Sequence, residues 1–486
     1  MRKAFIAGIL CISILLMPGG TVSAAVLSEP NGAAATISTS DHGTYVEGEA
    51  LAIVRDNEKP WAAGQAERLA EVGPEAVQAV IREWEKSGYG GTGVYKAEAG
   101  QPRQQKTDTF TVWCVTDRHK TAEQIVQELQ ADPKVVAAEP NYLVYADKGP
   151  QEENKSVVPA EAGKADLSFM QWYAGGAGAA DSTPKNSAAK ASAADSSADA
   201  YTTPLSSGSG YSLEVPGWQE GRTNKDAPAN ASGTICIMDT GIDTDHPDLQ
   251  GVLYEFTPEQ QAKYGCGKYG YNASGDGRPE TEQKAVESHG THVAGIIAAN
   301  WNGEGVSGVA NGVKIFSVNV FGGNGSEQDM KSVIKGFQFL AEAAQEINLK
   351  AVNCSWGTVQ PQFILDVMVD ELGRKGVNTV IASGNRYCDL DESIDLGSQV
   401  HSEYAVVVNG ASMDGGMADF SCWGQDSTDV FAPGSEILSD VPATLRDEIN
   451  GELYSCQDNT QFYPEATPTG HLLSGVTSPI PIRAIR

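Results

Sequence analysis

The stretch from Thr234 to Gly241, which reads Thr-Ile-Cys-Ile-Met-Asp-Thr-Gly, decides the fold class of this 486-residue chain. Its first five residues form a short apolar run, which is typical of a parallel strand buried on both faces. Segments of helical length and spacing begin after His289 and after Gln328. Further short apolar runs lie at Val313–Phe321, Ala351–Asn353, Val377–Ala382 and Ala405–Val408. Strands that alternate with helices predict an α/β fold with a doubly wound parallel sheet, whose chemistry lies at the carboxyl ends of its strands.

Three polar clusters follow these predicted strands or begin these helices. Asp239 directly follows the first strand, where a carboxylate can orient an imidazole. Its Asp-Thr-Gly also suggests an aspartic protease, but that mechanism needs two carboxylates and the chain has no second Asp-Thr-Gly or Asp-Ser-Gly. His289 begins a predicted helix, where it can act as a general base. Alternatively, His289 and His292 could bind a metal ion, although the usual helical zinc motif, His-Glu-x-x-His, is absent. Asn385 follows the strand that ends near Ala382. Its side-chain amide could donate a hydrogen bond to an oxyanion, or it is an ordinary turn residue.

In the order Asp239, His289, Asn385, these clusters resemble the subtilisin-like serine proteases, the subtilase family (peptidase S8). The resemblance runs from about Gln171 to Gly434. It implies that Asp239 orients His289, that His289 is the general base, and that Asn385 donates to the oxyanion during proteolysis through an acyl-enzyme. Further matching motifs are His246-Pro247-Asp248-Leu249, His289 to Gly295, Asn353 to Gly357, Phe420 to Gly424 and Ala432-Pro433-Gly434.

The same resemblance assigns binding residues around the catalytic ones. Gly325-Ser326-Glu327 falls where the family pairs an edge strand with substrate, and Ser355-Trp356-Gly357 falls beside the primary specificity pocket. Asp248 and the loop that contains Asn302 fall where the family binds a structural calcium ion, with Gln171 as a further ligand if Phe169–Tyr173 is the mature start. Their hard oxygen ligands suit Ca²⁺, and a solvated aspartate beside a surface loop is the alternative. No organic cofactor is expected.

The nucleophile motif of the family, Gly-Thr-Ser-Met-Ala-x-Pro, occurs nowhere in the chain. Ser478 follows a threonine and is the nearest candidate, but eight residues follow it and two of the first three are prolines, which disfavour a helix. Three hypotheses remain, of which the first two are a secreted serine endopeptidase made as a zymogen and a truncated or frame-disrupted, catalytically inactive homologue that at most binds peptide. A metal hydrolase built on His289 and His292 is a third hypothesis, which lacks a ligand set.

The chain before the protease-like region divides into three zones. Residues 1–24 are interpreted as a secretory signal peptide. Two basic residues precede an apolar run, and a small-residue cleavage site follows it; the run is too short to span a membrane. Residues 44–147 alternate in a β-α-β-α-β order and predict a small α+β (ferredoxin-like) domain, which by resemblance is the inhibitory propeptide. Residues 148–210, rich in Ala and Ser, predict a flexible linker, with propeptide cleavage between about Ala146 and Phe169. Residues 211–486 are expected to form the catalytic domain, apparently truncated at its C-terminus.

Charge and cysteine content restrict partners and compartment. The chain has 34 Lys and Arg against 63 Asp and Glu, a net charge of −29 that disfavours nucleic acid and anionic membranes. We therefore expect a secreted, extracellular protein that acts on protein or peptide, with its own propeptide as intramolecular inhibitor and no membrane after signal cleavage. Of the eight cysteines, Cys11 lies in the signal and six follow Cys114. Their pairing is open, and several buried thiols with one disulfide are the expectation.

Overall fold

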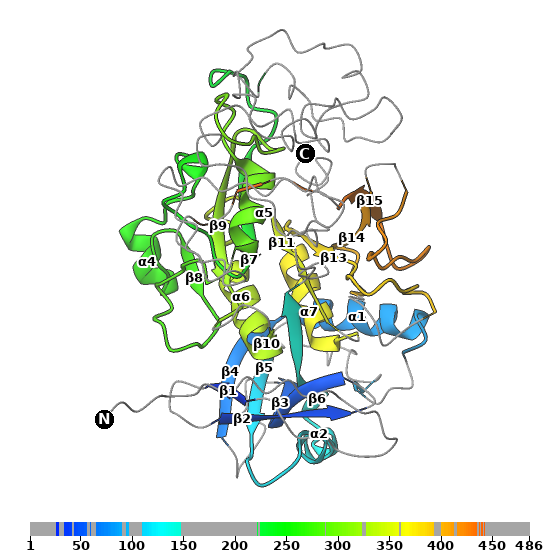
Figure 1. The fold of residues 1–486 in the computed structure, drawn as a ribbon. Helices are drawn as coiled ribbons and strands as arrows, with labels where there is room; N and C mark the ends of the chain where they lie inside the picture. The colour runs from blue at the N-terminus through cyan, green and yellow to red at the C-terminus, as the bar shows by residue number, and fades with distance from the viewer. Residues whose placement is uncertain are drawn as a thin grey trace, which may run out of the picture.

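The computed structural model describes residues 26–28, 34–40, 43–55, 59, 65–89, 94–96, 109–146, 221, 224–286, 288–322, 327–358, 361–392, 400–412, 416–434, 437, 439–440 and 442. The described residues form two sheets, a parallel one in the upper part of Figure 1 and an antiparallel one in the lower part. The predictions for the signal peptide, the linker, Gln171, Phe169–Tyr173, Gly325, Ser326 and Ser478 fall outside the described residues.

The parallel sheet confirms the predicted fold class. Its strand order is β15-β14-β13-β11-β7-β9-β8, and all neighbouring strands are parallel. Strand β7 comes first in the chain and lies inside the sheet, so the strand order reverses beside it, which places a crevice at its carboxyl end. The bounds of the strands are β7 Gly233–Asp239, β8 Gly270–Asn272, β9 Val313–Asn319, β11 Leu349–Cys354, β13 Asn378–Ala382, β14 Ala405–Ala411 and β15 Val430–Pro433.

Helices cover both faces of this sheet, which explains why its strands are apolar throughout. In β7, Ile235 and Ile237 pack in the cluster that contains helix α5, His289–Ala298. Cys236 and Met238 point to the other face and pack in the cluster that contains α6, Met330–Ala343, and α7, Phe363–Gly373. Each such buried side chain contributes about 1.5–3 kcal/mol. The remaining elements of this region are η8 Pro247–Leu249, α4 Pro258–Tyr264, β10 Glu327–Asp329 and β12 Trp356–Gly357.

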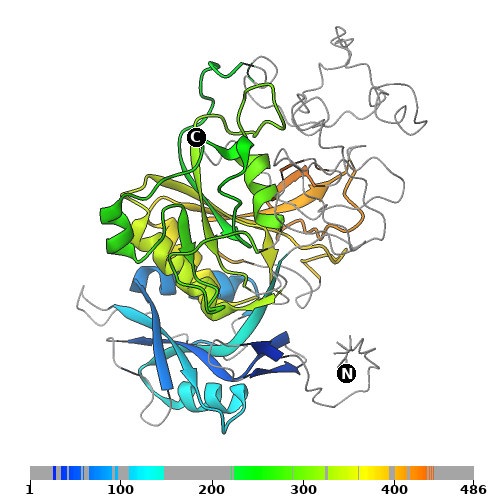
Figure 2. The same ribbon diagram turned by 60° about the vertical axis from the view of Figure 1, so that its left-hand side comes forward.

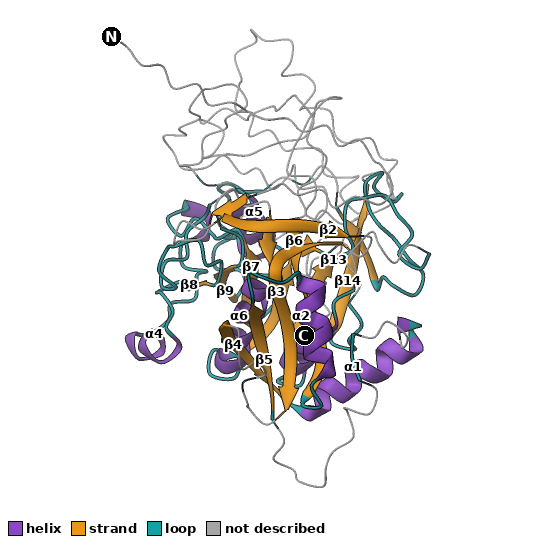
Figure 3. Ribbon diagram, turned by 90° about the horizontal axis from the view of Figure 1, so that it is seen from below, coloured by secondary structure: helices purple, strands orange, loops and turns teal. Residues whose placement is uncertain are grey.

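The antiparallel sheet is formed mainly by residues 43–146. Its path is β1-β2-β3-β5-β4, with β6 on the other side of β3, and the lower view shows α2 close to β3 (Figure 3). Strand β4 was not predicted, because its sequence is rich in Ala and charged residues that strands disfavour. The bounds are β1 Val26–Ser28, β2 Ala34–Ser40, β3 Gly43–Arg55, β4 Gln65–Val72, α1 Pro74–Lys86, β5 Phe110–Thr116, α2 Ala122–Ala131 and β6 Val135–Ala146.

The two sheets are joined by packing and by one strand. Helix α1 lies against α7, and β4 lies against α6, so that one continuous apolar cluster spans both parts. The end of β6 leaves the antiparallel sheet and reaches the upper part of the molecule, where the teal segment rises in Figure 2. Over the described residues, no helix has the length and apolar character needed to cross a membrane.

Candidate active site

A buried acid–imidazole pair lies at the carboxyl end of β7. His289 Nδ1 donates to the carboxylate of Asp239, at 2.8 Å from Oδ1 and 3.0 Å from Oδ2. Both side chains are almost fully buried, and Oδ1 also accepts the backbone N–H of Thr240 at 2.7 Å. This contact fixes the ring orientation and the tautomer with its proton on Nδ1, so that Nε2 carries the lone pair that can accept a proton.

Close backbone approach holds the two residues together. The start of α5 lies so near the turn after β7 that a Cβ on Gly290 would be 2.3 Å from the carbonyl oxygen of Gly241. Gly241 itself has φ of 96°, a left-handed conformation that favours glycine. The backbone N–H of Gly290 donates to Thr240 Oγ1 at 3.0 Å. The Asp-Thr-Gly and His-Gly sequences therefore form one packed junction.

Other predicted residues lie at the ends of neighbouring strands. Ser355 and Trp356 follow β11 and are fully buried, with Trp356 Nε1 donating to the carbonyl oxygen of Met238 at 2.8 Å. Asn385 follows β13 and is half-buried. Because β7, β11 and β13 are parallel neighbours, their ends share one edge of the sheet, as the predicted active site requires.

Strand β6 runs antiparallel between two strands at this edge. Tyr145 is paired with Glu327 of β10 on one side and with Gly357 of β12 on the other. Ala146 is paired with Trp356. The guanidinium of Arg386, next to Asn385, lies 5.9 Å from the centre of the Tyr145 ring. The structure thus brings the predicted binding residues Glu327, Trp356 and Gly357 around the last residues of β6.

Polar contacts with the first turn of α6 hold β6 next to β10. Asn141 Oδ1 accepts the backbone N–H of Lys331 at 3.1 Å, and Asn141 Nδ2 donates to Glu49 Oε2 at 2.8 Å. Lys331 Nζ lies 3.6 Å from Glu49 and 3.7 Å from Asp329. A buried amide and a charge network therefore set the register of β6 against β10.

His292 lies one helical turn after His289 but has a different partner. Its Nε2 is 3.1 Å from the carbonyl oxygen of Ile437, and its own carbonyl accepts from Ser439 Oγ at 2.7 Å. The described residues contain no group of three His, Cys, Asp or Glu side chains placed to hold a metal ion. The two histidines therefore bind separate groups in this structure.

Asp248 is buried against the loop that contains Asn302. Its Oδ2 accepts the backbone N–H of Val306 at 3.0 Å, and its carbonyl accepts the N–H of Asn300. Asn302 is exposed, and its Oδ1 accepts the N–H of Glu304 at 2.9 Å. The structure brings the loop to Asp248 but turns the Asn302 side chain toward its own loop.

A second carboxylate lies beside Asp248. Asp440 is fully buried, and its Oδ2 is 3.8 Å from His246 Nδ1. Burial raises the pKa of Asp248 to about 7, with a further contribution from Glu304, and burial and the Asp248 charge raise the pKa of Asp440. Burial lowers the pKa of His246 to about 4. The two adjoining carboxyl groups therefore repel each other when both are ionised.

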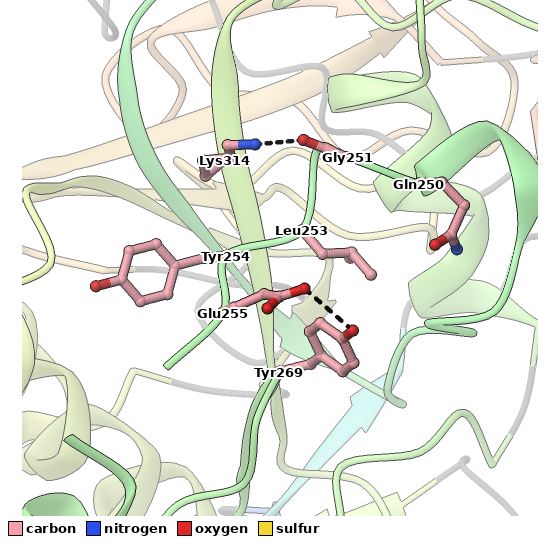
Figure 4. A pocket seen from close by; sticks show the side chains of 7 residues that line it. All are labelled: Gln250, Gly251, Leu253, Tyr254, Glu255, Tyr269 and Lys314. Carbon is pink, nitrogen blue, oxygen red and sulfur yellow. Dashed lines mark hydrogen bonds between the residues drawn. The ribbon is translucent and has the colours of Figure 1, made fainter. Parts of the chain in front are cut away.

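Figure 4 shows a separate pocket, near β8 and β9. The Lys314 ammonium donates to the carbonyl oxygen of Gly251, and Tyr269 donates to Glu255 at 3.3 Å. None of its residues is among the predicted site residues. The lining residues are Gln250, Gly251, Leu253, Tyr254, Glu255, Tyr269 and Lys314.

Two buried polar contacts that join helix α7 to the antiparallel part of the molecule were not predicted from the sequence. Glu139 of β6 accepts the backbone N–H groups of Phe363 and Ile364 at 3.1 and 3.2 Å, at the start of α7. Trp84 Nε1 donates to Asp366 Oδ2 at 2.5 Å. Helix α7 receives no side-chain cap from Gln362, so the absence of a Ser, Thr, Asp or Asn before Phe363 was the available signal.

A hydrogen-bonded carboxylate and imidazole at the switch point of a doubly wound sheet have the arrangement of an orienting acid and a general base in a hydrolase. The model of the subtilase family matches residues 231–470. Subtilisin Savinase of Lederbergia lenta is 31% identical over 219 residues, which are 45% of this chain and 69% of that protein. The chain belongs to the subtilase family of subtilisin-like serine proteases.

A second relative is much longer than the matched region. Fervidolysin of Fervidobacterium pennivorans is 34% identical over 227 residues, which are 44% of this chain and 29% of that protein. The crystal structure of fervidolysin, described as a keratinolytic enzyme related to subtilisin, aligns with a TM-score of 0.46 and 21% identity over 91% of this chain and 54% of that chain. This chain therefore spans less than a third of the length of fervidolysin in the sequence match.

Proposed function

We propose that the chain is a serine endopeptidase precursor in which His289 acts as general base and Asp239 orients it. The buried contact between the two supports these roles, because a fixed imidazole can take the proton of an attacking hydroxyl and return it to the leaving amine. Asn385 is the proposed oxyanion donor, placed by the strand that ends at Ala382. The substrate is protein or peptide.

The observation that carries the proposal is the pairing of the end of β6 with β10 and β12. An extended peptide recognised by strand addition forms backbone hydrogen bonds with the edge of a sheet, and side-chain pockets then give specificity. Tyr145 and Ala146 have such pairing, with β10 on one side and β12 on the other. The end of β6 is thus placed as a bound peptide would be, next to the loop of Asn385.

From this pairing of β6 we infer that residues 44–147 act as an intramolecular inhibitor. The buried contacts of Glu139, Asn141 and Trp84 with the parallel-sheet region support stable docking. Release then requires cleavage after Ala146, as expected from the sequence. The signal-like residues 1–24 support export to the extracellular space.

We also propose a structural calcium ion at Asp248. The buried Asp248 carboxylate and the carbonyl oxygens of the adjoining loop are oxygen ligands of the type that Ca²⁺ prefers, and Asn302 would join them by turning its side-chain oxygen away from Glu304. Bound there, the ion would offset the repulsion between Asp248 and Asp440 and fasten the loop to η8. It has no part in the proton transfers of the site.

A fluorophosphonate probe tests the protease function. We expect the full chain, after release of residues 44–147 by limited proteolysis, to form a covalent adduct at one serine, found by mass spectrometry of the digested protein. His289→Ala is expected to abolish the adduct, while His119→Ala, which changes an exposed histidine outside the site, keeps it.

The competing function is peptide binding without turnover. The backbone pairing of Tyr145 and Ala146 with β10 and β12 supports it, because this pairing requires no nucleophile. Folded protein that binds a peptide with the sequence of residues 139–146 but gives no serine adduct would establish this alternative and refute the protease proposal.

A further inference from the structure

Two cysteine side chains meet in the region that follows β13. The Sγ atoms of Cys388 and Cys422 are 2.9 Å apart. Cys388 is 6% exposed and Cys422 is fully buried, and the two form a small apolar cluster with Leu390. The contact joins residues that are 34 positions apart in the sequence.

The backbone holds the two residues in register. Asp389 and Trp423 form a parallel bridge, and the N–H of Trp423 donates to the carbonyl oxygen of Cys388 at 3.0 Å. Cys388 and Cys422 are the preceding pair in this register. Neighbouring strands lie about 4.8 Å apart. That spacing falls within the Cα separation of about 4.4–6.8 Å that a disulfide spans.

Other cysteines have different surroundings. Cys114 Sγ donates to Glu49 Oε2 at 3.6 Å in the antiparallel sheet. Cys236 and Cys354 lie in the buried strands β7 and β11, and Cys266 follows α4. Among the cysteines that the structure describes, the geometry therefore favours the pairing of Cys388 with Cys422.

We propose that Cys388 and Cys422 form a disulfide that fastens the loop of Asn385. The two thiols lose two protons and two electrons, and one S–S bond forms between them. A small-molecule disulfide such as glutathione disulfide is the oxidant; its S–S bond breaks and takes up the two electrons and two protons as two thiols. The relevance of the bond to an exported enzyme rests on the proposed function, whereas its formation depends only on the fold.

The bond would act on the oxyanion side of the site. The N–H of Cys422 donates to the carbonyl oxygen of Gly384 at 2.9 Å, and Ser383 Oγ donates to the carbonyl oxygen of Cys422 at 2.9 Å. The loop of Asn385 is therefore attached to Cys422 on both sides of Asn385. Hydrogen bonds hold Ser383 and Gly384, and the disulfide would hold Cys388. Cys388 and Cys422 would be positioning residues, which limit the motion of the Asn385 amide.

Peptide mapping of the wild-type chain decides the proposal directly. Burial, with the neighbouring Cys422 thiol, raises the pKa of Cys388 to about 12, and the thiolate is the reactive form, so exchange in the folded protein is slow. The purified full chain is therefore equilibrated for days at pH 8.5 in a buffer of glutathione and glutathione disulfide, then denatured, alkylated without reductant and digested. We expect the Cys388 and Cys422 peptides to be linked. Alkylation of both thiols, or a link from either to another cysteine, would overturn the proposal.

A stability measurement tests the mechanical consequence. Reduction by dithiothreitol should lower the Tm of the oxidised chain by about 5–15 °C, because the bond closes a long loop. It should also raise the hydrogen exchange of the amides of residues 384–390. The Cys388→Ala/Cys422→Ala variant should show neither change, while Cys266→Ala keeps both. An equal Tm in the oxidised and reduced wild type would refute the fastening role, and none of these readouts requires hydrolysis of a substrate.

Discussion

Glu139→Gln should change the pH dependence of the contact between β6 and α7. Glu139 is 2% exposed, and burial raises its pKa to about 8, although the N–H groups of Ile364 and Phe363 lower it and the Asp366 carboxylate adds to the rise. In an undocked chain the same carboxyl group has an ordinary pKa near 4.5. Between these two pKa values the docked state holds a proton that the undocked state has lost. The stabilisation is therefore complete below about pH 4.5 and is lost as the pH rises to about 8.

The size of the effect follows from the two pKa values. Each pH unit inside the window changes the free energy of docking by at most about 1.4 kcal/mol, so the whole window amounts to several kcal/mol in order of magnitude. Glutamine has the same length and does not titrate. At pH 5 we expect Glu139→Gln to be about 1 kcal/mol less stable than wild type, because its one amide oxygen serves two N–H groups. At pH 8.5 the order should reverse.

Urea unfolding at pH 5, 7 and 8.5 measures this difference, and hydrogen exchange of the β6 and α7 amides locates it. Glu85→Gln, a change of an exposed carboxylate on α1, is the matched control and should follow the wild type at each pH. Parallel stability profiles for wild type and Glu139→Gln would refute the reasoning, because the buried carboxyl group would then not be the source of the pH dependence.

Three further predictions follow from other contacts. Trp84→Phe should lose about 2–3 kcal/mol of unfolding free energy in urea, because it removes the hydrogen bond to Asp366, whereas Trp113→Phe should be nearly neutral, since the Trp113 Nε1 atom has no acceptor within the described part of the chain. Equal losses would contradict this account. Asp239→Asn should slow fluorophosphonate labelling by about 10⁴-fold through loss of the correct His289 tautomer, and an unchanged rate would exclude that role. Removal of calcium with EDTA should lower the wild-type Tm by about 5–10 °C but leave that of Asp248→Asn unchanged; the same shift in both would place the ion elsewhere.

The parallel sheet could be predicted because its signals are local. Short apolar runs mark strands that are buried on both faces, and Asp239 follows one of them without a gap. His289 could be placed at a helix start for the same reason. The expectation that Asp239 orients His289 came from the resemblance to the subtilases, because His289 starts helix α5 and does not end a strand of the sheet.

The contact between β6 and α7 and the pairing of two cysteines could not be predicted, because they depend on residues far apart in the chain. Glu139 caps a helix that begins at Phe363, and neither sequence shows the other. The pairing of Cys388 with Cys422 depends on the register of two short segments, which composition does not encode. Strand β4 was missed since packing against α6 outweighs the weak strand preference of its residues.

The position of β6 also determines how the docking of residues 44–146 onto the parallel-sheet region depends on protein concentration. While the chain between Ala146 and Gly221 is intact, the end of β6 meets the gap between β10 and β12 at an effective concentration that dilution cannot change. A single cut in that segment turns the same set of hydrogen bonds into an ordinary bimolecular equilibrium. If residues 44–147 inhibit the protease as proposed, the uncut chain stays inhibited at any concentration, whereas the cut protein loses its inhibitor on dilution.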